Sequence, residues 1–277
     1  MLLHGDEMGA DSLATKAQAP RQVLCMRWGS LYGVEYVNRL YEAVRRQTAE
    51  KLRFVCMTDD TDGLDPEVEA HPCPELDIPR PWNNYAWRKL ALFDDLENAY
   101  GLTGDWLFLD LDVVVTGGID SFFEFAVEEP FVAMQNWTQP GKGIANTSVF
   151  RFRVGAHQYL VDLVRGDFHQ FLSQYRNSQT FVSREIDTFR FWPDSWCALF
   201  KVNCVPPWPA RFWQTPKLPD DARVVAFPGS PNPPDAMVGD WPEKRWWKKI
   251  YKQIRPTPWI ETHWIGRGDE ASEDQAG

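Results

Sequence analysis

Long apolar runs alternate with helical periods over the first part of the chain, and this pattern predicts the order of its elements. Three apolar runs predict buried strands, at 21–29, 52–57 and 106–115. Between them, apolar residues recur at helical spacing over 36–47 and 86–100. This order is that of βαβ units, and uninterrupted apolar strands are typical of a sheet covered on both faces. The pattern therefore predicts an α/β fold with a mostly parallel central sheet.

The rest of the chain carries shorter and less regular elements. A stretch rich in proline and acids at 64–84 predicts a loop. Because no repeat or linker interrupts the pattern, we expect one domain over 21–265, preceded by a flexible leader (1–20) and followed by an acidic tail (266–277). Short apolar segments predict the later elements, which are strands at 131–136, 146–152, 201–205 and 222–227 and a helix at 156–166.

Charge and cysteine content narrow the classes of protein that fit. A net charge of −10 argues against a nucleic-acid binder, whose footprint is a basic surface. No apolar run is long enough to span a membrane, and the N-terminus lacks the basic and apolar regions of a secretory signal. Five cysteines without a CxxC spacing predict reduced thiols in a cytoplasmic protein and argue against a metal site built on sulfur.

Two aspartates interrupt the apolar run "LFLDLDVVVTGG". Side chains two residues apart in a strand point to the same side, so Asp110 and Asp112 can converge on one object. They come where the strand should end, which is the edge at which open α/β sheets bind ligands. Paired carboxylates suit Mg²⁺ or Mn²⁺. The alternative is that one aspartate caps a backbone group and the other is solvated.

Two enzyme classes place D-x-D after an apolar strand. Haloacid-dehalogenase-type phosphatases use the first aspartate as nucleophile, but their motif normally follows the first strand, and two strands precede it here. The chain resembles instead the GT-A glycosyltransferases, nearest to bacterial relatives of the glycogenin and lipopolysaccharide-galactosyltransferase group. The resemblance covers most of 21–265, and the segments that carry it are "VLCMRWGSLYGVEYVNRLY", "FVCMTDD", "WRKLALFDDL", "WLFLDLDVVVTGGIDSFFEF", "GIANTSVFRF" and "VVAFPGSPNP".

What the resemblance implies is a Rossmann-like GT-A fold and a hexosyltransferase. Residues 21–118 would be the nucleotide-binding half and 119–265 the half that holds the donor sugar and the acceptor. A sugar would move from a nucleotide sugar, with UDP the expected nucleotide, to a hydroxyl of a glycan, a lipid-linked acceptor or a protein in surface-glycan synthesis. A Mn²⁺ or Mg²⁺ ion would hold the diphosphate. A catalytically degenerate nucleotide-sugar-binding protein is the second alternative, beside the phosphatase.

The resemblance also implies roles for particular residues. Asp110 would lie at the ribose and the metal, and Asp112 would be the firmer metal ligand and a catalytic residue. Lys89 matches the lysine that approaches the donor diphosphate or sugar, and is otherwise an exposed helix cation. The remaining donor-binding candidates could equally be turn formers, and they are Thr58 and Asp59 after the second strand, and Asn146 and Ser148 before a later one.

The late segment "AFPGSPNPP" departs from the family pattern. The family has a metal-ligating histidine there, and this chain has Pro228, whose side chain cannot bind a metal. The third ligand is then a water, Asp235 or His263. The stiff loop would form one wall of the donor site, with Gly229 as a donor-binding candidate.

The segment "NSQTFVSREIDTF" lies where the family has an acidic, glutamine-containing motif near the reacting centre. The resemblance makes three polar residues in it catalytic candidates, namely Gln179, Glu185 and Asp187. These residues do not decide between retention and inversion at the anomeric carbon.

A basic, tryptophan-rich stretch at 244–255 has helical spacing, with aromatic residues on one face and lysines on the other. One interpretation is a peripheral contact with the anionic inner face of a membrane. The interpretation we favour from the sequence is that the aromatic face packs on the domain and the lysines are solvated.

Overall fold

The described part of the computed structural model comprises residues 19–80, 82 and 86–266, so the predicted leader and tail lie almost wholly outside it. Within these residues the strands are β1 (Arg21–Arg27), β2 (Leu52–Thr58), β3 (Glu69–His71), β4 (Asp105–Leu109), β5 (Val113–Val115), β6 (Phe131–Gln135), β7 (Ala145–Arg153), β8 (Arg190–Phe191), β9 (Cys197–Leu199) and β10 (Val224–Ala226). The α-helices are α1 (Val34–Arg46), α2 (Leu96–Tyr100), α3 (Asp120–Glu124), α4 (Tyr159–Gln174), α5 (Ser178–Glu185), α6 (Pro233–Val238) and α7 (Pro258–Ile260). Tighter or wider turns form the 3₁₀-helices η2 (Ala86–Phe93), η4 (Ala210–Phe212) and η5 (Trp246–Ile250) and the π-helices η3 (Phe200–Cys204) and η6 (Glu261–Ile265).

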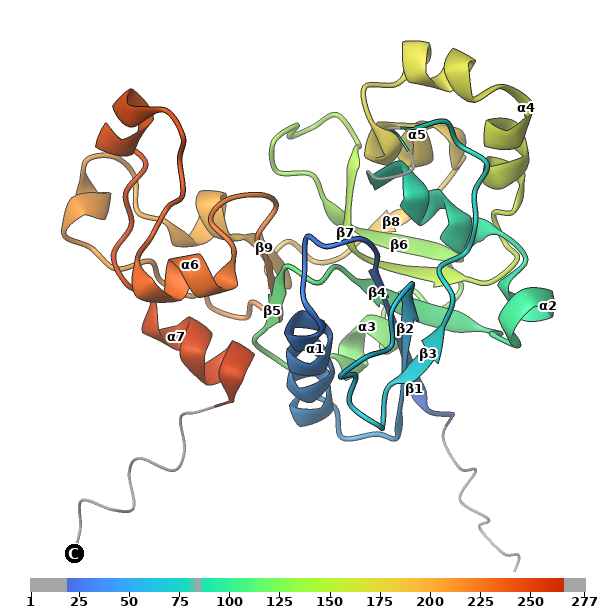
Figure 1. Cartoon of the computed structure of the whole chain (residues 1–277), viewed down its shortest axis with the longest axis horizontal. Helices are drawn as coiled ribbons and strands as arrows, with labels where there is room; N and C mark the ends of the chain where they lie inside the picture. Colours follow the sequence, from blue (N-terminus) through green and yellow to red (C-terminus); the bar gives the residue numbers. More distant parts are fainter. Residues whose placement is uncertain (1–18, 81, 83–85, 267–277) are drawn as a thin grey trace, which may run out of the picture.

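The predicted mostly parallel sheet is confirmed. Seven strands lie in the order β3-β2-β1-β4-β7-β6-β8. The first four are parallel to one another, whereas β7 runs antiparallel to β4 and β6. A second, three-stranded sheet has the order β5-β10-β9. Figure 1 shows α4 and α5 on one side of the larger sheet and α1 on the other.

The larger sheet separates two apolar cores, which explains its uninterrupted apolar strands. In β1, Val23 and Cys25 point into the core that contains α1 and the small sheet. Leu24 and Met26 point into the core beneath η2, α4 and α5. All four are at most 4% exposed. Burial on both faces removes the alternation of polar and apolar residues that a one-sided sheet needs.

Four sequence predictions about elements are wrong in detail. The run 106–115 is two strands, because the chain leaves the larger sheet after β4 and enters the smaller one at β5. Segment 201–205 is the π-helix η3, with the strand β9 just before it. The helix at 86–100 is broken, because Asp95 caps a new helix, α2, by accepting a hydrogen bond from the Asn98 N–H at 3.1 Å. The loop 64–84 contains β3.

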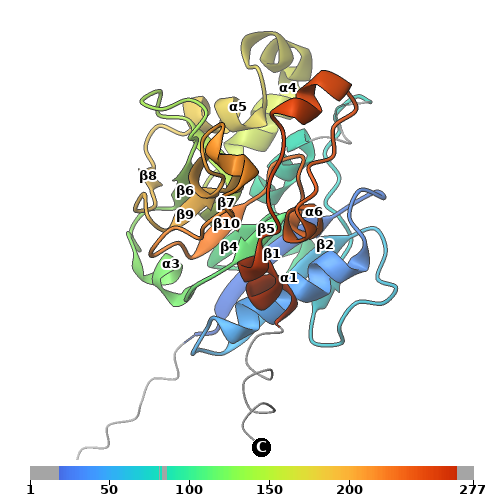
Figure 2. The same ribbon diagram turned by 90° about the vertical axis from the view of Figure 1, so that its left-hand side faces the viewer.

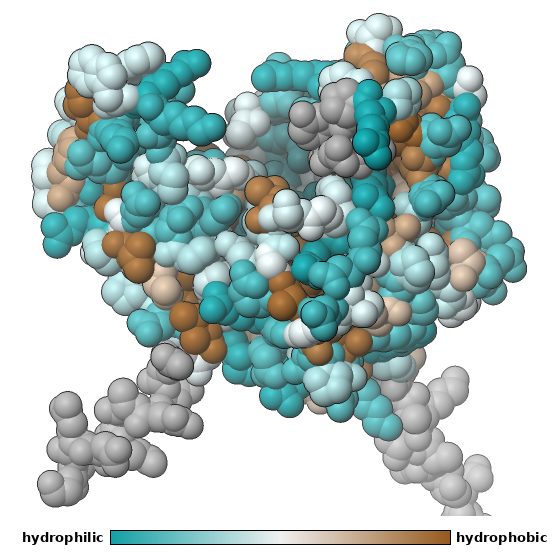
Figure 3. Space-filling model, in the orientation of Figure 1, coloured by the Kyte–Doolittle hydropathy of each residue, from teal (hydrophilic) through white to brown (hydrophobic). Residues whose placement is uncertain are grey.

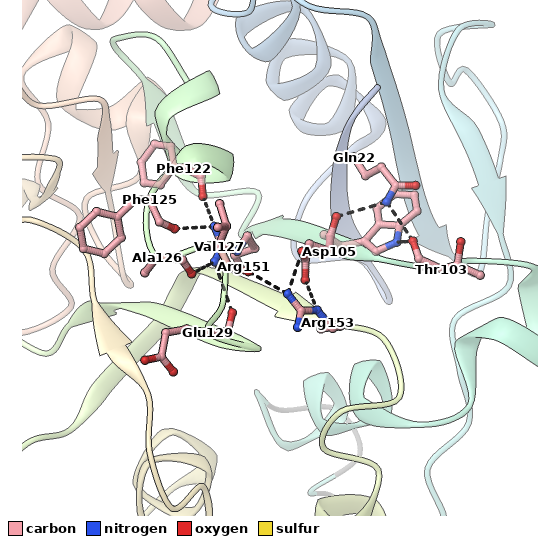
Figure 4. Close-up of polar contacts among 11 residues, drawn as sticks. Gln22, Thr103, Asp105, Phe122, Phe125, Ala126, Val127, Glu129, Arg151 and Arg153 are labelled. Atoms are coloured by element: carbon pink, nitrogen blue, oxygen red, sulfur yellow. Dashed lines mark hydrogen bonds and ion pairs between the residues drawn. The ribbon is translucent and has the colours of Figure 1, made fainter. Parts of the chain in front are cut away.

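A buried arginine ties β7 to the chain that leaves α3 (Figure 4). Arg151 is 1% exposed and donates to the carbonyls of Phe122, Phe125, Ala126 and Glu129 at 2.5–3.3 Å. Ala126 has a positive φ of 45°, a conformation that side chains disfavour. The guanidinium therefore stabilises this irregular turn by donating to four carbonyls of α3 and the chain that follows it.

The last third of the chain builds a separate part around the small sheet and α6. The terminal segment α7–η6 packs beside α1, as Figures 1 and 2 show, and the rings of Trp264 and Tyr36 lie 5.3 Å apart. Figure 3 shows the surface hollowed between this part and the one that carries α4 and α5. No helix among the described residues is long and apolar enough to cross a membrane. All five cysteines are buried and free, as expected for reduced thiols.

The favoured interpretation of 244–255 is wrong. Only the five residues of η5 are helical, and they leave their apolar side chains in solvent. The exposed fractions are 74% for Trp246, 48% for Trp247, 59% for Ile250 and 43% for Tyr251, whereas Ile254 is buried. The aromatic side chains of this stretch therefore lie in solvent and not in the core.

Candidate functional site

The turn between β4 and β5 carries Asp110 and Asp112 and is held from both sides. The Asp110 N–H donates to the Ser148 carbonyl of β7 at 2.9 Å. The Asp112 carbonyl accepts from the N–H of Phe227, just after β10, at 2.9 Å. The two aspartates are thus not in one strand, as the sequence predicts, but in a turn whose two ends belong to different sheets. They nevertheless line the same pocket.

Lys89 compensates the first carboxylate. Its ammonium comes from η2, lies 2.5 and 2.7 Å from the two oxygens of Asp110, and donates to the Thr147 carbonyl at 3.3 Å. Both side chains of this ion pair are less than a fifth exposed. A charge-assisted contact of this kind is strong when it is shielded from water. Lys89 is therefore part of the site and not an exposed helix cation.

The negative charge of Asp112 is less well compensated than that of Asp110. It is 9% exposed, and its side chain accepts a hydrogen bond from the Tyr32 hydroxyl at 3.1 Å. Burial, followed by the charge of Asp110, raises the pKa of Asp112 to about 7, against the opposing effects of Lys89 and Tyr32. Burial, followed by the Asp112 charge, raises the pKa of Tyr32, which keeps this phenol protonated. The site is short of positive charge beside Asp112.

These groups lie in a pocket of ≈ 580 Å³, a volume within the usual range for ligand sites. The pocket is lined by Arg27 at the end of β1, by Tyr32 in the segment after β1, and by Lys89 with the β4–β5 turn. Figure 1 places the loop between β1 and α1 between the two parts of the molecule. Sequence analysis missed Arg27 and Tyr32. Their position at the end of a parallel strand and just after it was the available signal, because ligand crevices lie at the carboxyl ends of such strands.

Asp110 and Asp112 are the candidate ligands of a divalent cation. Within 19–80, 82 and 86–266, no three or more His, Cys, Asp or Glu side chains are grouped to hold an ion. Magnesium, however, is commonly bound through one or two carboxylates together with phosphate oxygens of the substrate. Asp110 and Asp112 fit such a site, because both carboxylates line one pocket of a size that admits a phosphate-bearing ligand.

Solved structures with a similar fold are glycosyltransferases. The galactosyltransferase LgtC, in complex with donor and acceptor sugar analogues, has a TM-score of 0.53 at 11% identity, over 76% of this chain and 88% of its own. GlyE from Streptococcus pneumoniae TIGR4 has a TM-score of 0.53 at 13% identity, over 77% of this chain and 56% of its own. The bifunctional glycosyltransferase WbbM has a TM-score of 0.54 at 10% identity, over 77% of this chain and 46% of its own.

The chain has the GT-A glycosyltransferase fold. The predicted resemblance is thereby confirmed at the level of fold. No family model matches the sequence, and no curated protein matches it.

Four donor-binding candidates border the GT-A pocket without lining it. Thr58 ends β2 opposite Arg27 and donates to the Asp60 carbonyl at 2.8 Å, and Asp59 pairs with Arg88 at 3.2 Å. Asn146 and Ser148 are buried in β7, where the Asn146 side chain accepts from the Ser148 N–H at 2.9 Å. Since the Ser148 carbonyl holds Asp110, these two residues position the carboxylate turn.

Two further candidates lie on flanking segments. Gly229 follows β10 in the left-handed region, with φ 68°, where other residues are strained. Gln179 is in the first turn of α5, and its side-chain carbonyl accepts from the Asn136 amide at 3.2 Å. Both belong to loops or helix ends close to strands of the site, but neither lines the ≈ 580 Å³ pocket.

The structure does not bring the remaining candidates to the two aspartates. Glu185 accepts from the Tyr175 hydroxyl at the far end of α5, and Asp187 is exposed just beyond it. The His263 carbonyl accepts from Arg46, in the last turn of α1, at 2.9 Å, so His263 packs at the end of that helix instead of completing a metal site. Asp235 accepts the Asn232 N–H at 2.9 Å as part of the N-terminal cap of α6.

Proposed function

We propose that this protein transfers a hexose from a UDP-sugar to an acceptor hydroxyl. The observation that carries the proposal is the pair Asp110 and Asp112, with Lys89, at the floor of a pocket at the carboxyl edge of a GT-A sheet. In the transfer, the bond between the anomeric carbon and the diphosphate oxygen breaks and its electron pair stays on UDP. The acceptor oxygen bonds to the anomeric carbon and its proton is released.

Each residue of the site has its own role in the proposed sugar transfer. Asp110 and Asp112 would hold a Mn²⁺ or Mg²⁺ ion. Such an ion supplies positive charge against the diphosphate as the leaving UDP becomes more negative. Tyr32 orients Asp112 through its hydrogen bond, and Lys89 shares its charge between Asp110 and the donor.

Gln179 is the polar group proposed nearest to the reacting centre. An active-site mutant of LgtC has a glutamine replaced by glutamate. In this chain Gln179 is held by Asn136 at the end of β6, whereas Glu185 and Asp187 lie farther along and beyond α5. We therefore assign Gln179, and not the two acids, to the neighbourhood of the donor sugar.

The function is tested by incubating the protein with a panel of UDP-hexoses and measuring released UDP. We expect slow hydrolysis of one UDP-hexose with Mn²⁺, and at least a tenfold lower rate with excess EDTA. Metal-dependent UDP binding without any turnover would indicate the degenerate binding protein. Release of phosphate from phosphomonoesters, lost on changing Asp110, would indicate the phosphatase instead.

The proposed acceptor is a surface glycan or its lipid-linked precursor, reached from the cytoplasmic face of an anionic membrane. The exposed aromatic residues of η5 support this location, because tryptophan beside lysine suits a membrane interface. Lys244, Lys248 and Lys249 are their neighbours in the sequence, and each basic residue near an anionic surface contributes about 1 kcal/mol.

The double variant Trp246→Ala/Trp247→Ala is expected to bind anionic vesicles about tenfold more weakly than the wild-type protein, because both indoles lose their interfacial contact. Sedimentation with phosphatidylglycerol vesicles, at low and high salt, measures this. Val127→Ala/Leu163→Ala is the matched control, since it removes exposed apolar side chains elsewhere. Salt-insensitive binding, or none by the wild-type protein, would rule out the membrane contact.

A further inference from the structure

Lys201 reaches the carboxylate turn from the small sheet. It lies in η3, directly after β9, whose residue Leu199 is in register with Ala226 of β10. Ala226 is in turn paired with Val113 of β5, next to Asp112. The chain thus brings Lys201 from the C-terminal part close enough for its charge to interact with that of Asp112, whereas Tyr32 contacts Asp112 from the β1–α1 loop.

The Lys201 ammonium is oriented but its charge is not neutralised. It donates to the carbonyls of Pro228 and Ser230, the latter at 3.1 Å, in the loop where the sequence lacks the expected histidine. An ammonium has three hydrogens, so these two contacts leave one for another acceptor. No carboxylate forms an ion pair with Lys201 within the described residues. Neutral carbonyls fix its position without cancelling its charge.

The electrostatic surroundings of Lys201 favour an incoming anion. Burial and the like charge of Lys252 lower the pKa of Lys201, and Asp112 acts in the opposite direction. Lys252 pairs with Glu243, so its own charge is partly compensated. A half-buried cation that already interacts with the charge of a second cation is stabilised when an anionic ligand binds.

We propose that Lys201 binds the diphosphate of the donor and offsets the negative charge that develops on the leaving nucleotide. This inference rests on the proposed function. It explains how a site with two carboxylates, and with Pro228 in place of a third ligand, can hold a diphosphate: positive charge comes from a lysine of the neighbouring small sheet. Lys201 is then a substrate-binding residue that none of the sequence motifs marks.

The test compares UDP with uridine, which lacks phosphates, by calorimetry in the presence of Mg²⁺. Lys201→Met is expected to weaken UDP binding at least tenfold and to leave uridine binding unchanged, because only the charge contact is removed. Lys201→Arg should retain most of the affinity. Lys201→Gln keeps donors for the two carbonyls without the charge, and should weaken UDP binding as much as Lys201→Met does.

The matched control is Lys217→Met, which removes an exposed lysine of the same part of the chain. If the wild-type protein binds no UDP, the proposed function fails and this inference fails with it. If the wild-type protein binds UDP and Lys201→Gln binds it equally well, only the assignment of Lys201 is overturned. An equal loss of uridine and UDP affinity would also overturn it, because that result indicates a structural role.

Discussion

Replacing Asp112 by asparagine is expected to abolish metal-dependent UDP binding and, at the same time, to stabilise the metal-free protein. The carboxylate is 9% exposed, lies close to Asp110, and has only the Tyr32 hydroxyl as a side-chain partner among the described residues. Asparagine keeps an oxygen that can accept from Tyr32 but carries no charge. The variant therefore loses the proposed cation ligand and also loses the cost of burying a second carboxylate.

The stabilisation has a defined pH dependence. The pKa of Asp112 is raised from its ordinary value of 3.8 to about 7, so between these values the folded protein keeps a proton that the unfolded chain releases. The free energy of unfolding of the wild-type protein should therefore fall as the pH rises from about 4 to about 7. The asparagine side chain has no such proton, so the Asp112→Asn variant should be more stable than the wild type at pH 8, by at most about 4 kcal/mol.

Urea denaturation at pH 4 and pH 8 in EDTA measures the stability, and calorimetry with UDP and Mn²⁺ measures the binding. Asp220→Asn, at an exposed position, is the control for removing one negative charge from an acidic protein. A variant that is less stable than the wild type at pH 8 would show that Asp112 is compensated in the free protein. A variant that still binds UDP with Mn²⁺ would remove Asp112 from the donor site.

Replacing Arg151 by methionine is expected to cost about 3–5 kcal/mol of unfolding free energy. The four carbonyls that Arg151 binds belong to α3 and the turn after it, and methionine fills the space without donating to any of them. Each buried acceptor left without a partner costs free energy, and Ala126 loses the contact that holds its positive φ.

Arg153→Met provides the comparison two residues along the same strand. Arg153 pairs with Asp105 at 2.9 Å, but its side chain is 40% exposed, so water can replace the pair and the loss should be about 1 kcal/mol. Figure 4 shows the two arginines side by side. Equal losses for the two variants, in urea denaturation, would contradict the structural role given to Arg151.

The sequence pattern predicted the sheet better than it predicted where the chain changes sheets. The run 106–115 is apolar apart from its two aspartates because both β4 and β5 are buried, so hydrophobicity alone does not reveal that the chain leaves one sheet after Leu109. In the segment 244–255, by contrast, the pattern predicted a longer helix than the structure contains. Its spacing is helical, yet prolines at 242 and 256 flank it and no core lies beneath its aromatic side chains.

The sequence predicted those site residues that belong to the D-x-D motif or to a segment that resembles the family. Asp110, Asp112 and Lys89 come together as expected, although their chemical roles remain predictions. Tyr32 and Lys201 were not found, because a residue in a loop or an irregular helix carries no periodic signal. His263 was wrongly placed, because its distance from the aspartates depends on how the last turns pack against α1.

The attachment of the carboxylate turn has a mechanical consequence. Asp110 is hydrogen-bonded to β7 of the large sheet and Asp112 to the segment after β10 of the small sheet. The two carboxylates therefore lie on different sides of the junction between the sheets. A small movement of one sheet relative to the other would therefore change the distance between the two carboxylates. Near this junction, helix α1 contacts Trp264 and the His263 carbonyl of η6. Substitutions at this contact, which does not line the pocket, would thereby alter the spacing of Asp110 and Asp112.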